Sequence, residues 1–267
     1  SHQHNDALGI EVFSHGFPFI VDPGITGYMR DHWTEYYRSS FSHNTLLLNG
    51  KEQIASRLLG HLNCESVRGA FTSSLGETAD FIRSVYRDGY QDLPETAYHS
   101  RAILFVRNAF WILFDEAGGC PLEEIEARFQ FVPLRLTVDR RKKTFRTMRQ
   151  DRPNMEIRVL DPGRKTNLSI VTGETRPVAG WIAAAEDVPA PQARIRYSPK
   201  HPPADTPLRM VTLIAPYNSG LSTRLNVRRE RSAPGVSQYK IRSERNRTHH
   251  IMFDWEEARA EYNGERL

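Results

Sequence analysis

Apolar segments of strand length, separated by short groups of turn residues, recur along almost the whole chain, whereas helical periodicity is scarce. Leu8–Phe13 and Phe17–Val21 flank the turn Ser14–Gly16, and a second close pair is formed by Ala102–Val106 and Phe110–Phe114. Two apolar runs joined by so few residues are typical of a β-hairpin. The pattern predicts antiparallel sheets and argues against a parallel α/β fold, which needs a helix between successive strands.

Further segments extend this pattern to the C-terminus. They are Thr45–Leu48, Ala127–Val132, Leu134–Val138, Met155–Val159, Leu168–Val171, Arg209–Ile214, Ser237–Arg242 and His249–Phe253. We therefore expect an all-β fold, a large antiparallel β-sandwich of two stacked sheets, with Trp111 and Trp181 at least partly buried. One domain is expected over residues 1–267. The segment Val188–Pro207 holds six prolines and is predicted to be a long surface loop, because proline cannot donate a hydrogen bond within a central strand pair.

The charge balance narrows the classes of partner. The chain has 36 Lys and Arg against 32 Asp and Glu, a net charge of +4, which suits an acidic partner. The basic clusters fall in strands and turns and are interpreted as solvated surface, so no nucleic acid partner is expected. No segment approaches the roughly 18 apolar residues of a membrane span, and membrane insertion is not expected either. An acidic small molecule or glycan remains as the partner class.

Two imidazoles and a carboxylate alternate in the N-terminal segment, at His2, His4 and Asp6. In an extended strand, residues two apart project from the same face, about 6.6 Å from each other. One imidazole is then able to bind a metal while the other stays free to act on a substrate. An expression-tag remnant would leave a similar pair, so the pair alone does not decide.

Two later residues complete a possible ligand set. The predicted hairpin returns through Val21 to Asp22, which brings a carboxylate back towards His4, and His43 stands at the entry to a further strand. Two histidines and one carboxylate with an open position form a common zinc arrangement. In the competing interpretation, Asp22 only caps the turn before Pro23 and Gly24, and His43 is a hydrogen-bonded core histidine.

A family resemblance bears on this choice. The stretches HQHNDALGIEVFSHGFPFIVDPG and YYRSSFSHNTLLLNGKEQ resemble the heparinase II/III-like C-terminal domain of polysaccharide lyases, which also occurs in related alginate lyases. The later stretches YHSRAILFVRNAFWILFDEAGG, VAGWIAAAEDVPAPQARIRY and LRMVTLIAPY are similar to further strands of that domain. Members of the family normally carry a large helical toroid before this domain. The resemblance therefore implies an upstream helical domain as a partner in the same protein.

The resemblance also implies roles for individual residues. His2 would be catalytic, whereas His4, Asp22 and His43 would bind zinc or another divalent metal. Asn5 and Asp6 would orient the site from behind the ligands. Tyr37 and Arg38 are candidates for contact with the substrate, although a packed tyrosine and a surface arginine are equally good interpretations.

The implied chemistry is β-elimination at a uronic acid of an acidic polysaccharide. Such a lyase removes the proton next to the carboxylate, stabilises the charge that develops and protonates the departing oxygen. The zinc would be structural, because elimination consumes no water. Two alternatives stay open, a non-enzymatic carbohydrate-binding β-sandwich and a metal-dependent glycan hydrolase. The expected compartment is periplasmic or secreted, with the cytoplasm not excluded.

Overall fold

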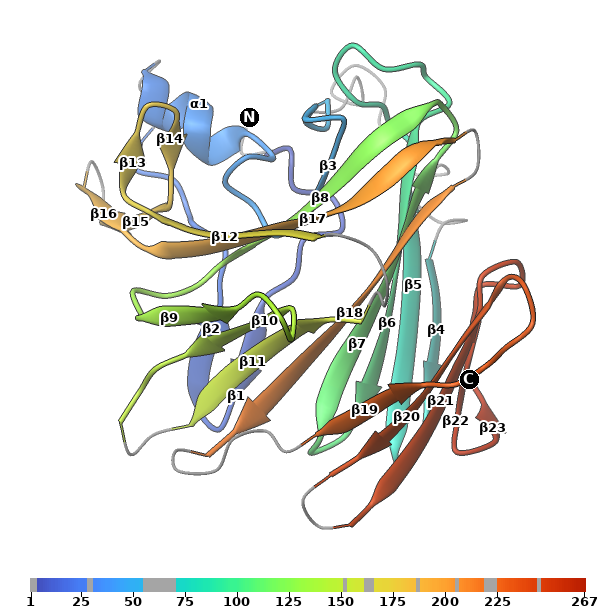
Figure 1. The fold of residues 1–267 in the computed structure, drawn as a ribbon. Coiled ribbons are helices and arrows are strands. Elements are labelled where there is room, and N and C mark those ends of the chain that lie inside the picture. The colour runs from blue at the N-terminus through green and yellow to red at the C-terminus, as the bar shows by residue number, and fades with distance from the viewer. Residues whose placement is uncertain are drawn as a thin grey trace.

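A computed structural model describes the chain except for residues 1–3, 28–30, 55–70, 151–152, 161–165, 186–187, 205–206, 219–224 and 244–245, and except for the side chains of 199–204. Antiparallel strands dominate, and α1 (His32–Arg38) is the only helix in the described residues (Figure 1). Among these residues, no helix has the length and apolarity that crossing a membrane requires. The predicted all-β fold is confirmed.

An eight-stranded antiparallel sheet forms the middle of the molecule. Its strands, in spatial order, are β4 (Phe71–Leu75), β5 (Ala79–Tyr86), β6 (Tyr98–Val106), β7 (Phe110–Gly118), β18 (Leu208–Tyr217), β11 (Asn154–Val159), β10 (Thr144–Thr147) and β9 (Leu136–Asp139). The predicted hairpin of β6 and β7 is present, with Val106 opposite Phe110.

Smaller sheets lie around this central sheet. A four-stranded sheet contains β12 (Thr166–Thr172), β17 (Ala193–Ala204), β8 (Leu122–Gln130) and β3 (Leu46–Leu48). A five-stranded sheet contains β19 (Asn226–Arg229), β20 (Val236–Arg242), β21 (Thr248–Asp254), β22 (Arg259–Tyr262) and β23 (Glu265–Arg266). Three hairpins pair β1 (Val12–Ser14) with β2 (Phe17–Ile20), β13 (Glu174–Thr175) with β14 (Val178–Ala179), and β15 (Trp181–Ala185) with β16 (Val188–Pro191).

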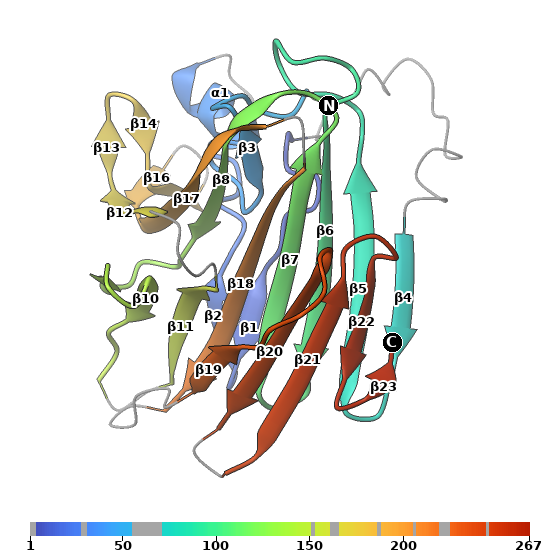
Figure 2. The ribbon, with the colours of Figure 1, turned by 45° about the vertical axis from the view of Figure 1, so that its right-hand side comes forward.

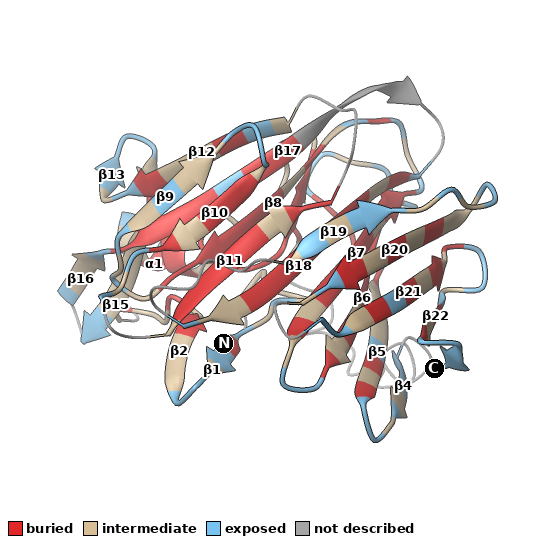
Figure 3. Ribbon diagram, turned by 60° about the horizontal axis from the view of Figure 1, so that its bottom comes forward, coloured by how far each residue is buried: buried red, intermediate tan, exposed pale blue. Residues whose placement is uncertain are grey.

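The central sheet is buried on both faces, so the sandwich has three layers. Along β7, Leu113 and Ala117 belong to the core shared with the four-stranded sheet, whereas Ile112 and Phe114 belong to the core shared with the five-stranded sheet. Successive side chains of a strand point to opposite faces, which assigns alternate residues to the two cores. Figure 2 shows the C-terminal strands in front of β5–β7, and Figure 3 shows burial concentrated along the central strands. The third layer adds to the expected pair of sheets.

The prediction of a long surface loop at Val188–Pro207 is wrong. This region forms β16 and the long strand β17, which pairs with β12 on one side and β8 on the other. Five of the six prolines lie in β16 and in the distal half of β17, while the part between them carries the alternating core residues Ile195 and Tyr197. Tertiary burial of that alternation outweighs the local effect of the prolines.

The predicted positions of the two tryptophans are confirmed, since Trp111 and Trp181 are both partly buried. The first predicted strand is shorter than expected, because β1 begins only at Val12. The preceding residues bond to side chains instead of a neighbouring strand. Gln53 accepts from the Ala7 N–H at 2.8 Å, and Asn44 Nδ2 donates to the Ile10 carbonyl at 2.8 Å.

We predict that Phe114→Ala lowers the free energy of unfolding by about 3–5 kcal/mol, the usual cost of truncating a buried aromatic residue. The Phe114 ring is buried and stacks on Phe253 with centroids 4.2 Å apart, so it joins the central sheet to the third layer. Phe13→Ala is the matched control, because Phe13 is 60% exposed and should cost less than about 0.5 kcal/mol. Urea unfolding measures both. Similar values for the two variants would contradict the assignment of the second core.

Candidate metal centre

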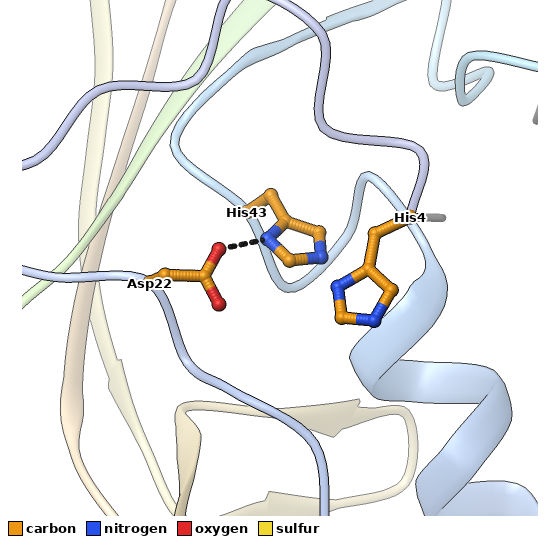
Figure 4. A group of neighbouring side chains, drawn as sticks. All are labelled: His4, Asp22 and His43. Carbon is orange, nitrogen blue, oxygen red and sulfur yellow. Dashed lines mark hydrogen bonds and ion pairs between the residues drawn. The ribbon is translucent and has the colours of Figure 1, made fainter. Parts of the chain in front are cut away.

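His4, Asp22 and His43 converge although they come from three separate segments. Their nearest ligand atoms all lie within 4.8 Å of one another, and the two imidazole centroids are 5.1 Å apart. Figure 4 shows the three side chains around one space, with the imidazole of His4 beside that of His43. Zinc bonds of about 2.0–2.2 Å hold ligand atoms roughly 3–4 Å apart. A shift of about 1 Å would bring this set to metal-binding distances.

The hydrogen bonds of His43 define which of its nitrogens can bind a cation. Nε2 lies 2.8 Å from the Tyr37 carbonyl oxygen, which can only accept, so Nε2 carries a hydrogen. Nδ1 lies 2.9 Å from Asp22 Oδ2. If His43 is neutral with its hydrogen on Nε2, the lone pair of Nδ1 points at the Asp22 carboxylate. This arrangement needs either a second proton on Nδ1 or a metal cation between the imidazole and the carboxylate. The Tyr37 carbonyl resembles the outer partner that orients a metal-bound histidine.

Electrostatics keep His4 and Asp22 in forms that can bind a metal. Burial and the nearby His43 lower the pKa of His4, which favours the neutral imidazole with a free lone pair. Burial alone would raise the pKa of Asp22, but the His43 hydrogen bond and charge and the Gly24 N–H lower it overall. Gly24 donates to Asp22 Oδ1 at 2.8 Å. Asp22 therefore caps its turn with one oxygen and faces His43 with the other, so the two interpretations of this residue are compatible.

The loop that carries His43 begins where α1 ends. Asp31 caps the start of α1 by accepting from the Thr34 N–H, and Ser39 N–H donates to the Tyr36 carbonyl at its end. Two buried arginines of the four-stranded sheet, Arg128 and Arg194, then donate to the Phe41 carbonyl at 3.1 and 2.9 Å. These bonds hold the loop against the sheet two residues before His43.

The N-terminal segment is irregular, so the extended spacing expected between His4 and Asp6 is wrong. Asn5 N–H donates to the Arg38 carbonyl at 2.8 Å, and Asn5 Nδ2 donates to Glu52 at 3.1 Å. Asp6 lines a cavity of about 330 Å³ together with Asp22 and His43. The segment thus crosses the end of α1, and the hydrogen bonds of Asn5 fix the chain directly after His4.

A buried ion pair lies beneath both segments and was not predicted from the sequence. Arg101 donates from Nε to Asp115 Oδ1 at 2.7 Å and from Nη2 to Oδ2 at 3.2 Å. Its Nη1 donates to the carbonyls of Leu8 and Asn44, at 2.7 and 2.9 Å. His99 Nε2 donates to Asp115 at 2.9 Å. The sequence signal that could have revealed this network is the presence of charged residues within otherwise apolar strands.

The remaining predicted site residues are placed differently. His2 lies outside the described residues. The Tyr37 side chain is fully buried, so the substrate contact predicted for it is corrected, and its carbonyl serves His43 instead. Arg38 is partly buried, and its charge contributes to lowering the pKa of His4.

Comparison with known proteins relates this chain to heparinases. The sequence profile of the family described as heparinase II/III-like, C-terminal, matches residues 1–234. Heparan sulfate lyase HepC from Pedobacter heparinus has a similar structure, with a TM-score of 0.75, 17% identity and coverage of 94% of this chain and 37% of HepC. Heparinase III gives 0.73 at 19% identity, with coverage of 95% and 36%. No curated protein sequence matches the chain. The chain thus spans little more than a third of those solved structures and shares their fold.

The buried His99 should make stability depend on pH. Burial lowers its pKa below the ordinary value of 6.5, while the Asp115 hydrogen bond opposes this only in part. Below that value the unfolded chain binds a proton that the folded chain does not, so the free energy of unfolding falls as the pH falls. The contribution of one such group is at most about 1.4 kcal/mol per pH unit.

We predict that His99→Gln reduces this slope between about pH 5 and 7, where histidine titrates. The glutamine amide of the variant can still donate a hydrogen bond to Asp115. The lowered pKa of Asp115 affects the free energy of unfolding only below the ordinary carboxyl value of 3.8, outside this pH range. Urea unfolding over this pH series is the measurement, with the exposed His15→Gln as control. Equal slopes for wild type and His99→Gln would show that His99 does not resist protonation.

Proposed function

The chain belongs to the heparinase II/III-like C-terminal domain family, and from this premise we propose that it completes a lyase that cleaves uronic-acid-containing polysaccharides by β-elimination. The observation that carries the proposal is the convergence of His4, Asp22 and His43, together with the position of His2 two residues before His4 in the sequence. HepC is a heparan sulfate lyase, which supports an acidic polysaccharide as the substrate class. A periplasmic or secreted location suits such a substrate.

In this proposal His2 and the three candidate ligands have different roles. His2, two residues before a ligand, takes part in proton transfer or in neutralising the substrate carboxylate. His4, Asp22 and His43 hold zinc, which supplies a fixed positive charge that ties the N-terminal segment to the His43 loop. The orientation of His43, with Nδ1 directed at a carboxylate and Nε2 on a carbonyl, suits a divalent ion.

Neither of the two tyrosines next to the His43 loop suits the role of leaving-group acid. Tyr36 and Tyr37 are the nearest candidates by sequence, but burial raises the pKa of both. The Tyr36 hydroxyl already accepts from the Gly180 N–H at 3.2 Å, and Tyr37 is fully buried. We therefore assign the acid and the rest of the carboxylate-binding groups to an upstream helical domain of the same protein.

Two rival functions make different chemical predictions. A metal-dependent hydrolase would use the ion to activate water, whereas elimination consumes none. Elimination leaves an unsaturated sugar that absorbs in the ultraviolet, and hydrolysis does not. A non-enzymatic carbohydrate-binding sandwich would need neither the three ligands nor His2. Product analysis therefore separates all three functions.

We predict that the chain binds one zinc ion and that His43→Ala and Asp22→Ala each weaken binding more than about a hundredfold, because even outer partners of ligands are worth 10–100-fold. Elemental analysis after dialysis and competition with a chromophoric chelator measure stoichiometry and affinity. His15→Ala, an exposed histidine outside the site, should leave both unchanged. Equal affinity of His43→Ala and wild type would refute the ligand set.

We also predict that the 267-residue chain alone has little or no lyase activity on heparin-type or alginate-type polymers. Losing one acid/base or electrostatic element typically costs on the order of a hundredfold or more in rate, and several are assigned elsewhere. Ultraviolet absorbance of the new double bond is followed for the chain and for a longer form with the helical domain. Strong activity of the short chain that His2→Ala abolishes would show that this division of labour is wrong.

A further inference from the structure

A second cavity lies on the opposite face of the central sheet from the candidate metal centre. It has a volume of about 410 Å³ and is bounded by Arg209 and Val211 of β18, Arg229 of β19, Tyr239 of β20, and Trp255. We call it the β18–β20 cavity. Val211 and Tyr239 belong to the core under the five-stranded sheet, as does Ala102 of β6. Arg101 is the neighbour of Ala102, so it points to the opposite face of the sheet, beneath the metal centre. The two sites are therefore separated by the sheet itself.

Arg209 is held in a fixed position at the wall of this cavity. Its Nε donates to Glu116 Oε2 at 2.7 Å, and its guanidinium carbon lies 5.1 Å from the centroid of the Trp255 ring. Trp255 is fixed in turn, because its Nε1 donates to Ser237 Oγ at 2.9 Å. About a third of the Arg209 side chain stays exposed. A guanidinium group that is already oriented loses less freedom when it binds a carboxylate or a sulfate.

Arg229 faces the same cavity from the end of β19. It follows the partly buried Val227 by two residues, so it projects on the same side of the strand, whereas Arg228 projects on the other. Arg229 is exposed and makes no ion pair with another described residue. Its charge is therefore available to a ligand.

More arginines continue the positive surface beyond the cavity. Arg87 lies 4.8 Å above the ring of Tyr98, and the Tyr98 hydroxyl donates to Glu116 at 2.9 Å. Burial and Glu116 raise the pKa of Tyr98 to about 12, while Arg87 and Arg209 oppose this rise, which shows that these charges act on one another. Arg83 is also close enough to Glu116 for its pKa to be affected. Arg83, Arg87 and Arg209 thus lie near the Glu116 carboxylate or near its hydrogen-bond partner Tyr98.

We propose that the β18–β20 cavity and its arginines bind an anionic sugar unit of a polysaccharide, carrying a carboxylate or sulfate, as a non-catalytic second site. The volume is at the lower end of the roughly 300–1,000 Å³ of small-molecule sites. Guanidinium groups match carboxylate and sulfate oxygens in pairs, and the Trp255 ring offers an apolar wall. Glu256 borders Gly235 at the rim and disfavours anions there, so the charged group is expected on the Arg209–Arg229 side.

This inference rests on the proposed function only in its choice of an acidic polysaccharide as ligand. Tyr239 and Trp255 lie beyond residue 234, where the family match ends, so the cavity is built partly from residues that the match does not include. A site on this face would keep a long polymer attached while its other part reaches the candidate metal centre.

The test compares Arg229→Ala with Arg228→Ala in the whole chain, using a size-defined heparin oligosaccharide as the probe and titration calorimetry as the measurement. Both residues are exposed on the same strand and carry the same charge, so overall electrostatics and folding are matched. Loss of a hydrogen-bonded ion pair should weaken binding by about tenfold for Arg229→Ala, and Arg87→Ala should add to it. Arg228→Ala should stay within about twofold of wild type, as expected for a charge outside the site.

Hydrogen exchange of the complex locates the ligand. Protection of amides in 229–239 and near Trp255 is expected, also in a His43→Ala variant that lacks the candidate metal centre. Protection confined to 38–45, or equal affinities for the Arg228 and Arg229 variants, would overturn the second site without bearing on lyase activity. If Arg229→Ala weakens the binding of polyphosphate as much as the binding of the oligosaccharide, the surface binds polyanions in general, which would also overturn the proposal.

Discussion

The buried ion pair of Arg101 and Asp115 is the interaction on which the arrangement of the candidate metal centre depends. Both side chains are almost completely buried, where an uncompensated charge would cost several kcal/mol. Their bidentate contact and the His99 hydrogen bond satisfy the carboxylate. The remaining donor, Nη1, then reaches the carbonyls of Leu8 and Asn44. One guanidinium group therefore connects the central sheet to the N-terminal segment and to the residue after His43.

Polar side chains, more than strand pairing, hold the segments of the centre together. Asn44 donates to the carbonyls of Ile10 and Val21 and accepts from the Gln130 N–H at 2.7 Å, so it joins three segments. Thr45 Oγ1 donates to the Ala7 carbonyl at 2.8 Å. The motif His43-Asn44-Thr45 therefore combines one candidate ligand with two residues that anchor the N-terminal segment. This dual use explains why an irregular segment can be presented from a regular sheet.

The two faces of the central sheet support different tasks. One face, with the four-stranded sheet and α1, carries the converging ligands, and the other carries the arginines around Glu116 beside the third layer. A sheet buried on both sides is stiff because its interior is close-packed. Such a support would hold both candidate sites in fixed positions, and the fold that provides it covers 37% of HepC and 36% of heparinase III.

The all-β architecture could be predicted from residue spacing alone, because a period of two residues in apolar strands cannot be buried in any other regular structure. Local pattern also predicted that Asp22 returns towards His4, and the structure brings His4, Asp22 and His43 together. Their role as metal ligands came from the family resemblance and stays a prediction. The third layer, the strand β17 within a proline-rich segment and the burial of Tyr37 became apparent in the folded protein. The Arg101–Asp115 network was likewise hidden, because its partners Leu8 and Asn44 lie 93 and 57 residues away. Which face a strand buries and which distant carbonyl a charge meets depend on the packing of whole sheets, and local residue spacing does not contain that information.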